Sequence, residues 1–137
     1  MRIAVIYFSG GQRQRLVDVS KGLSKGLETQ GHQVDLIDGD RDVNTKLTIY
    51  GYIALGVSSP TVFGGKIPEN ANKFLANAGI IAGKRCFAYT LKYGLRASKT
   101  LSKLMGIMEH EGMFLKYSEI LTSSLEAEAI GKRLHTQ

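Results

Sequence analysis

An apolar run leads directly into two glycines and a basic segment at residues 3–15, which read IAVIYFSGGQRQR. The six residues from Ile3 to Phe8 are mostly β-branched or aromatic, a pattern typical of a strand that is covered on both faces. Four apolar side chains follow at steps of three, four and four residues, as on one face of a helix: Leu16, Val19, Leu23 and Leu27. Gly31 lies where such a helix would end. This segment therefore predicts a strand, a glycine-containing turn and a helix in succession.

The alternation of strand and helix continues along the chain. Further strands are predicted over residues 34–37, 52–57, 86–91 and 113–120, and further helices over residues 71–78, 97–108 and 124–134. Gly79 and Gly112 follow the middle two helices, and residues 123–126 form a capping-box pattern that opens the last one. Only residues 38–49 show little helical periodicity. Because parallel strands need crossover connections, this order predicts an α/β fold, a doubly wound parallel sheet in three layers.

Composition narrows the class of protein. The 137 residues are 43% hydrophobic and 22% charged, so we expect one globular domain over residues 1–137. No apolar run approaches the roughly 20 residues of a membrane span. The single cysteine, Cys86, excludes an internal disulfide framework, fits a cytoplasmic location and is expected to be a small buried hydrophobe. The chain has 18 Lys and Arg residues against 12 Asp and Glu residues, so its net charge is 18 − 12 = +6. A positive net charge favours anionic partners.

The loop after the first strand is a candidate anion cradle. Glycines let the backbone turn its N–H groups toward an anion, the helix start adds a partial positive charge, and serine and arginine side chains add further donors. The candidate residues are Ser9, Gly10, Gly11, Gln12, Arg13 and Gln14. The loop lacks both the phosphate-loop pattern of nucleotide triphosphatases and the G-x-G-x-x-G of dinucleotide sites. A glycine-rich turn with solvated arginines remains the alternative.

Two further loops expose aromatic residues after the third and fourth strands, at the sheet edge where ligands of open parallel sheets bind. Such rings, beside irregular backbone, suit a flat heteroaromatic ligand. The candidate residues of the two loops are Ser59, Pro60, Thr61, Val62, Phe63 and Gly64, and Thr90, Leu91, Lys92, Tyr93 and Gly94. The alternatives are that Phe63 packs into the core and that Tyr93 is an ordinary surface residue.

These loops together resemble those of a known family. Tyr7-Phe8-Ser9-Gly10 after the first strand, SPTVFGGKIP at residues 59–68 and Tyr93-Gly94 after the fourth strand are similar to short-chain flavodoxins, over nearly the whole chain. The resemblance implies a five-stranded parallel sheet of order 2-1-3-4-5 and electron transfer on non-covalent FMN. It also implies that the first loop holds the FMN phosphate, while residues 59–64 and 90–94 enclose the isoalloxazine.

The phosphate loop departs from the family pattern. Flavodoxins usually carry Ser/Thr-x-Thr-Gly-Asn-Thr there, whereas this chain has SGGQRQ at residues 9–14, which retains only Ser9. Two interpretations remain open: Arg13 replaces the hydroxyl donors with a charged, bidentate one, or the phosphate site has been lost. Flavodoxins are also typically acidic, so the net charge of +6 predicts an acidic redox partner for this chain.

The sequence favours an FMN-binding electron carrier with no catalytic side chain over several other functions. The main alternative is a flavin-free module that uses the same loops for another anion or a protein partner. A flavin-dependent reductase is disfavoured because the chain leaves little room for a substrate-binding insertion. Specific nucleic-acid binding is not expected, because the basic residues are scattered without interleaved aromatic residues. Membrane association is not expected either, and no metal site is expected because the three histidines lack ligand spacing. Four acidic residues near the second strand are interpreted as solvated: Asp35, Asp38, Asp40 and Asp42.

Overall fold

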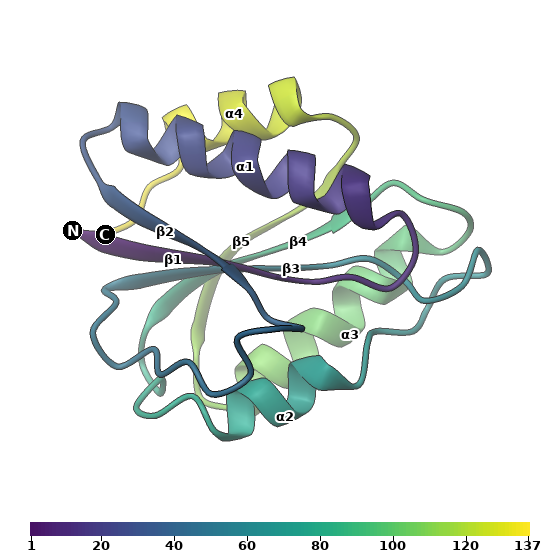
Figure 1. Ribbon diagram of the computed structural model, residues 1–137, viewed down its shortest axis with the longest axis horizontal. Coiled ribbons are helices and arrows are strands. Elements are labelled where there is room, and N and C mark those ends of the chain that lie inside the picture. Colours follow the sequence, from purple (N-terminus) through teal and green to yellow (C-terminus); the bar gives the residue numbers. More distant parts are fainter.

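The computed structural model describes all residues, 1–137, and contains one five-stranded sheet. Its strands are β1 (Arg2–Phe8), β2 (Gln33–Asp38), β3 (Tyr52–Val57), β4 (Arg85–Leu91) and β5 (Phe114–Leu121). All neighbouring strands pair in parallel, in the order β2-β1-β3-β4-β5 (Figure 1). The predicted parallel sheet of order 2-1-3-4-5 is confirmed.

Helices cover both faces of the sheet, as predicted. The helices are α1 (Arg13–Thr29), α2 (Asn70–Ala76), α3 (Ala97–His110) and α4 (Ser124–Arg133). Figure 1 shows α1 and α4 on one face and α2 and α3 on the other. Gly31, Gly79 and Gly112 follow α1, α2 and α3 with φ of 94°, 88° and 82°, the left-handed conformation that ends helices. At α4, the Ser123 side chain accepts a hydrogen bond from the Glu126 amide, which confirms the predicted cap.

The connection between β2 and β3 contains no helix. Residues 39–51 instead form a series of turns, in agreement with the weak periodicity of this segment. Leu47 and Tyr50 are buried there in the core, and the Leu47 amide donates to the Ala78 carbonyl at 2.7 Å. This segment therefore connects β2 to β3 without a helix and contributes buried side chains to the core.

Two apolar clusters form the core, one on each face of the sheet. Residues 52–57 of β3 are all buried, whereas β5 at the sheet edge is half-exposed. Cys86 is fully buried as expected, and burial together with the nearby Glu109 raises the pKa of its thiol to about 12. No helix of the chain combines the length and apolar character that crossing a lipid bilayer demands.

Helices α1 and α4 approach each other closely because glycine occupies their contact. A Cβ atom on Gly26 would lie 2.2 Å from the Glu128 carbonyl oxygen and 2.8 Å from the Gly131 Cα. Side chains at these positions would hold the helix backbones apart, so the absence of a Cβ sets their separation.

Candidate functional site

The three candidate loops meet at the carboxyl edge of the sheet, where the strand order reverses between β1 and β3. The Gly11 amide donates to the Ser59 carbonyl at 2.7 Å, which joins the first loop to the second. The Leu95 amide donates to the Val62 carbonyl, also at 2.7 Å, which joins the third loop to the second. The sequence thus located three loops that are in direct contact in the folded chain.

The first loop turns sharply before α1 begins. Gln12 adopts a left-handed conformation, with φ of 57°, and stands at the position where flavodoxins usually carry glycine. Gly10 packs so tightly that a Cβ there would lie 2.5 Å from the Pro60 nitrogen. Arg13 and Gln14 are the first two residues of α1, so their side chains begin at its positive end.

Acceptors from the protein itself engage the first amides of this loop. The Gly10 amide donates to the Ser58 hydroxyl at 2.9 Å, and the Gly11 amide donates to a backbone carbonyl as described above. The Ser9 amide and the Ser9 hydroxyl both donate to Asp40 Oδ2, at 3.0 and 2.9 Å. A carboxylate of the chain therefore occupies donors that were expected to hold a phosphate.

Asp38 and Asp40 belong to the site, which corrects their interpretation as solvated residues. Asp38 ends β2 and its side chain is only 11% exposed; it lies 2.6 Å from Arg13 Nη2 and 3.8 Å from Arg41 Nε. The side chain of Asp40 is 22% exposed and lies 3.6 Å from Arg13 Nη1. The parallel pairing of β1 with β2 explains this arrangement, since it places the ends of the two strands side by side.

The guanidinium of Arg13 is committed to these carboxylates. Its Nη1 also donates to the Ser9 hydroxyl at 2.9 Å, and the group lies over the ring of Tyr7. The hydrogen bond to Asp38 raises the pKa of Arg13 above its usual value. Burial, followed by the charge of Asp38, raises the pKa of Tyr7. Arg13 is thus not a free cation at the start of α1, contrary to expectation.

Arg15 differs from Arg13 because it pairs with no carboxylate. Its Nη2 donates to the carbonyls of Lys92 and Thr122, each at 3.3 Å. It therefore ties α1 to the ends of β4 and β5.

The second loop exposes apolar side chains to solvent. Val62 and Phe63 are 50% and 66% exposed, so the alternative that Phe63 packs into the core is wrong. Ser59 is buried and its hydroxyl donates to the Thr61 carbonyl at 2.8 Å. Gly64, with φ of 69°, packs against the backbone next to the third loop. A Cβ on Gly64 would lie only 1.7 Å from the Leu95 carbonyl oxygen.

The third loop contributes fewer free side chains than the sequence suggested. Thr90 and Leu91 still belong to β4: the Thr90 hydroxyl donates to the Val57 carbonyl at 2.7 Å, and Leu91 lies in the core. Lys92 is exposed. Tyr93 is half-buried, and its ring covers Gly11, where a Cβ would lie 2.8 Å from the ring. Gly94 packs against the Val62 carbonyl with φ of 62°.

As arranged, these loops do not fit FMN in the way the resemblance implies. The serine donors of the first loop are bonded to Asp40, and a phosphate there would meet two carboxylates. The second and third loops are hydrogen-bonded to each other, and no surface hollow is lined by any candidate residue. What the loops do present is an exposed apolar surface of Val62, Phe63 and Leu95.

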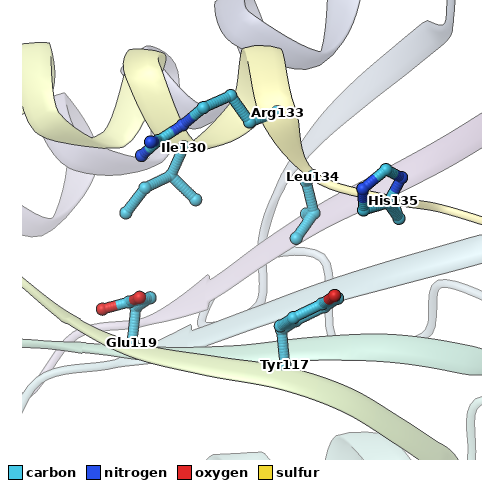
Figure 2. A pocket seen from close by; sticks show the side chains of 6 residues that line it. All are labelled: Tyr117, Glu119, Ile130, Arg133, Leu134 and His135. Atoms are coloured by element: carbon cyan, nitrogen blue, oxygen red, sulfur yellow. The ribbon is translucent and has the colours of Figure 1, made fainter.

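A separate hollow of about 220 Å³ lies between α4 and the half-exposed strand β5. Figure 2 shows its lining side chains, which are Tyr117, Glu119, Ile130, Arg133, Leu134 and His135. It shares no residue with the three loops. It reflects incomplete cover of the sheet edge by α4.

Comparison with known proteins supports the fold. No family model and no curated sequence matches the chain. Among solved structures, a cysteine-to-serine variant of the flavodoxin from Pseudomonas aeruginosa superposes with a TM-score of 0.74 at 15% identity, covering 97% of this chain and 95% of that one. Oxidised flavodoxin 2 from Bacillus cereus superposes with a TM-score of 0.72 at 18% identity, covering 97% of this chain and 94% of that one. A flavodoxin from the domain Archaea superposes with a TM-score of 0.68 at 16% identity, covering 97% of this chain and 95% of that one. Over nearly its whole length, the chain therefore has the flavodoxin-like fold.

Proposed function

We propose that this chain is an FMN-binding electron-transfer protein of flavodoxin type. The observation that carries the proposal is the convergence of the three loops at the reversal of strand order, the place where open parallel sheets bind ligands. The similarity of the fold to flavodoxins supports the same conclusion. Bound FMN would supply the redox chemistry, and the protein would supply the binding surface and its electrostatic potential.

The exposed apolar side chains are the part of the site best suited to a flavin ring. Val62 and Phe63 offer a surface against which a flat heteroaromatic system can stack. Lys66 and Lys92 are exposed on the same two loops, where positive charge favours a reduced, anionic flavin. The net charge of +6 supports an acidic redox partner whose association slows as salt rises. A cytoplasmic location, inferred from the single cysteine, stays a prediction.

A flavin-free binding module is the second candidate. The observation that favours it is the direct hydrogen bond between Val62 and Leu95, which closes the space between the second and third loops. Val62, Phe63 and Leu95 are each at least half-exposed, and such a patch also suits a protein partner. In that case the loops would serve as a docking surface.

Titration of the purified chain with FMN separates the two candidates. Flavin fluorescence quenching and calorimetry measure the affinity for wild type and for Phe63→Ala. The matched control is Phe114→Ala, because Phe114 is 55% exposed on β5 and lies outside the three loops. The proposed function requires binding by wild type, weakening by Phe63→Ala and no effect of Phe114→Ala. Absence of binding by wild type after refolding with excess FMN would favour the flavin-free module.

A further inference from the structure

We propose that Asp40 is an internal anion that fills the phosphate position of the first loop, so that this loop discriminates against phosphorylated ligands. Only what the inference implies for flavin binding rests on the proposed function. It predicts that flavin binds through its ring system, and that FMN gains no affinity from its phosphate over riboflavin.

The contacts of Asp40 are those that a bound anion would make. One carboxylate oxygen, Oδ2, accepts from the Ser9 amide at 3.0 Å and from the Ser9 hydroxyl at 2.9 Å, and it lies 3.6 Å from Arg13 Nη1. The other oxygen, Oδ1, lies 3.4 Å from the side-chain nitrogen Nδ2 of Asn70, which donates to it. A backbone N–H, a hydroxyl and a guanidinium are the donors that proteins use for phosphate, and here they converge on a carboxylate.

The turn after β2 holds Asp40 in this place. The Gly39 amide donates to the Tyr7 carbonyl at 2.9 Å, and the Asp40 amide donates to Asp38 Oδ1 at 3.0 Å. The ring of Phe8 lies 2.4 Å from where a Cβ on Gly39 would be, so only glycine allows the turn to pack here. Because the carboxylate is tethered and preorganised, it occupies these donors without the entropic cost that a free phosphate would have on binding.

Loss of the Asp40 carboxylate would free two donors at once, the Ser9 amide and the Ser9 hydroxyl, and would remove the carboxylate that lies 3.6 Å from Arg13 Nη1. Asp38 would still hold Arg13 Nη2 at 2.6 Å, so the guanidinium would remain in place. The loop would then offer the Ser9 donors to a phosphate without any new side chain, and Asp38 would be the one carboxylate still beside them.

The test compares wild type with Asp40→Ala and Asp40→Asn. The second variant keeps an acceptor for Ser9, so it preserves the turn if the alanine variant folds poorly. Asp42→Asn is the matched control, because Asp42 is exposed in the same segment, carries the same charge and makes no side-chain contact with the loop. Two measurements are made: the shift of the Ser9 amide in ¹H–¹⁵N NMR spectra on titration with inorganic phosphate, and the affinities for FMN and riboflavin.

We expect inorganic phosphate to move the Ser9 amide most in Asp40→Ala, less in Asp40→Asn, whose side-chain oxygen still accepts from Ser9, and not in wild type or Asp42→Asn. We also expect the ratio of FMN to riboflavin affinity to be near one in wild type and to rise about 10- to 100-fold in Asp40→Ala, the range of a charge-assisted hydrogen bond. A wild-type Ser9 amide that titrates with phosphate as the variants do would overturn the inference. Failure of every variant to bind flavin, with the phosphate result as expected, would refute the proposed function and leave the inference intact.

Discussion

Substitution of Gly26 by alanine tests the close contact between α1 and α4. The new Cβ would lie 2.2 Å from the Glu128 carbonyl oxygen and 2.8 Å from the Gly131 Cα, against about 3.5–4.0 Å for an unstrained contact. Both obstacles are backbone atoms of α4, so no side-chain rotation relieves them. The helices must move apart, and neighbouring leucines in the core lose contact.

The expected change in the free energy of unfolding is the difference between two opposing effects. Overpacking of this kind costs about 1–3 kcal/mol, and the backbone contacts place Gly26 at the upper end. Helix propensity returns about 1 kcal/mol when alanine replaces glycine. We therefore expect Gly26→Ala to lower the free energy of unfolding by about 2 kcal/mol.

Gly106→Ala is the matched control. Gly106 lies inside α3, is exposed, and has nothing within 4 Å of where its Cβ would be. The same substitution should stabilise the protein here by about 0.5–1 kcal/mol through propensity alone. Urea unfolding followed by far-UV circular dichroism measures both, with unchanged m values showing that midpoints report stability. If Gly26→Ala proves as stable as Gly106→Ala, the helix contact described here is wrong.

Three further predictions concern the site and the core. Tyr93→Ala should weaken FMN binding by about 1–3 kcal/mol if its ring stacks on the flavin; unchanged affinity in a fluorescence titration would leave Tyr93 only its contact with the first loop. In potentiometry, replacing Lys66 and Lys92 together by glutamine should lower the potential for the second electron added to bound FMN, and an unmoved potential would place these lysines away from it. Tyr89→Phe should lower the free energy of unfolding in urea by about 1–2 kcal/mol. The buried hydroxyl of Ser20 on α1 lies 2.6 Å from the Tyr89 hydroxyl and would lose its hydrogen-bond partner. Tyr52→Phe is its control: the buried Tyr52 hydroxyl has no partner, so its removal should not destabilise.

Local patterns were sufficient to predict the order of the elements along the chain and a parallel sheet, whereas the strand order was predicted from the resemblance to flavodoxins. Short continuous apolar runs such as residues 52–57 are typical of strands covered on both faces, and that strand was predicted with the bounds observed. Gly31, Gly79 and Gly112 each follow a helix because the left-handed conformation there suits glycine. The lack of a helix after β2 was visible in the weak periodicity of residues 38–49.

The electrostatics of the first loop could not be predicted in this way. Asp40 bonds to Ser9 across 31 positions of the chain, and Arg13 bonds to Asp38 across 25. A signal did exist: in a sheet of order 2-1-3, acidic residues directly after β2 must lie beside the loop after β1. The interpretation of the aspartates as a solvated turn did not take into account that the end of β2 lies beside the end of β1.

The sequence by itself determined which segments are strands, helices and loops, since those choices depend on periodicity, glycine and capping within a few residues. It also determined that Ser9, Phe63 and Tyr93 lie on loops at one edge of the sheet. Only the tertiary structure decided what those loops hold, because hydrogen bonds between distant segments depend on which strands are neighbours in space. The carboxylate of Asp40 reaches the donors of Ser9 through the pairing of β1 with β2, and no pattern within residues 9–14 records that contact.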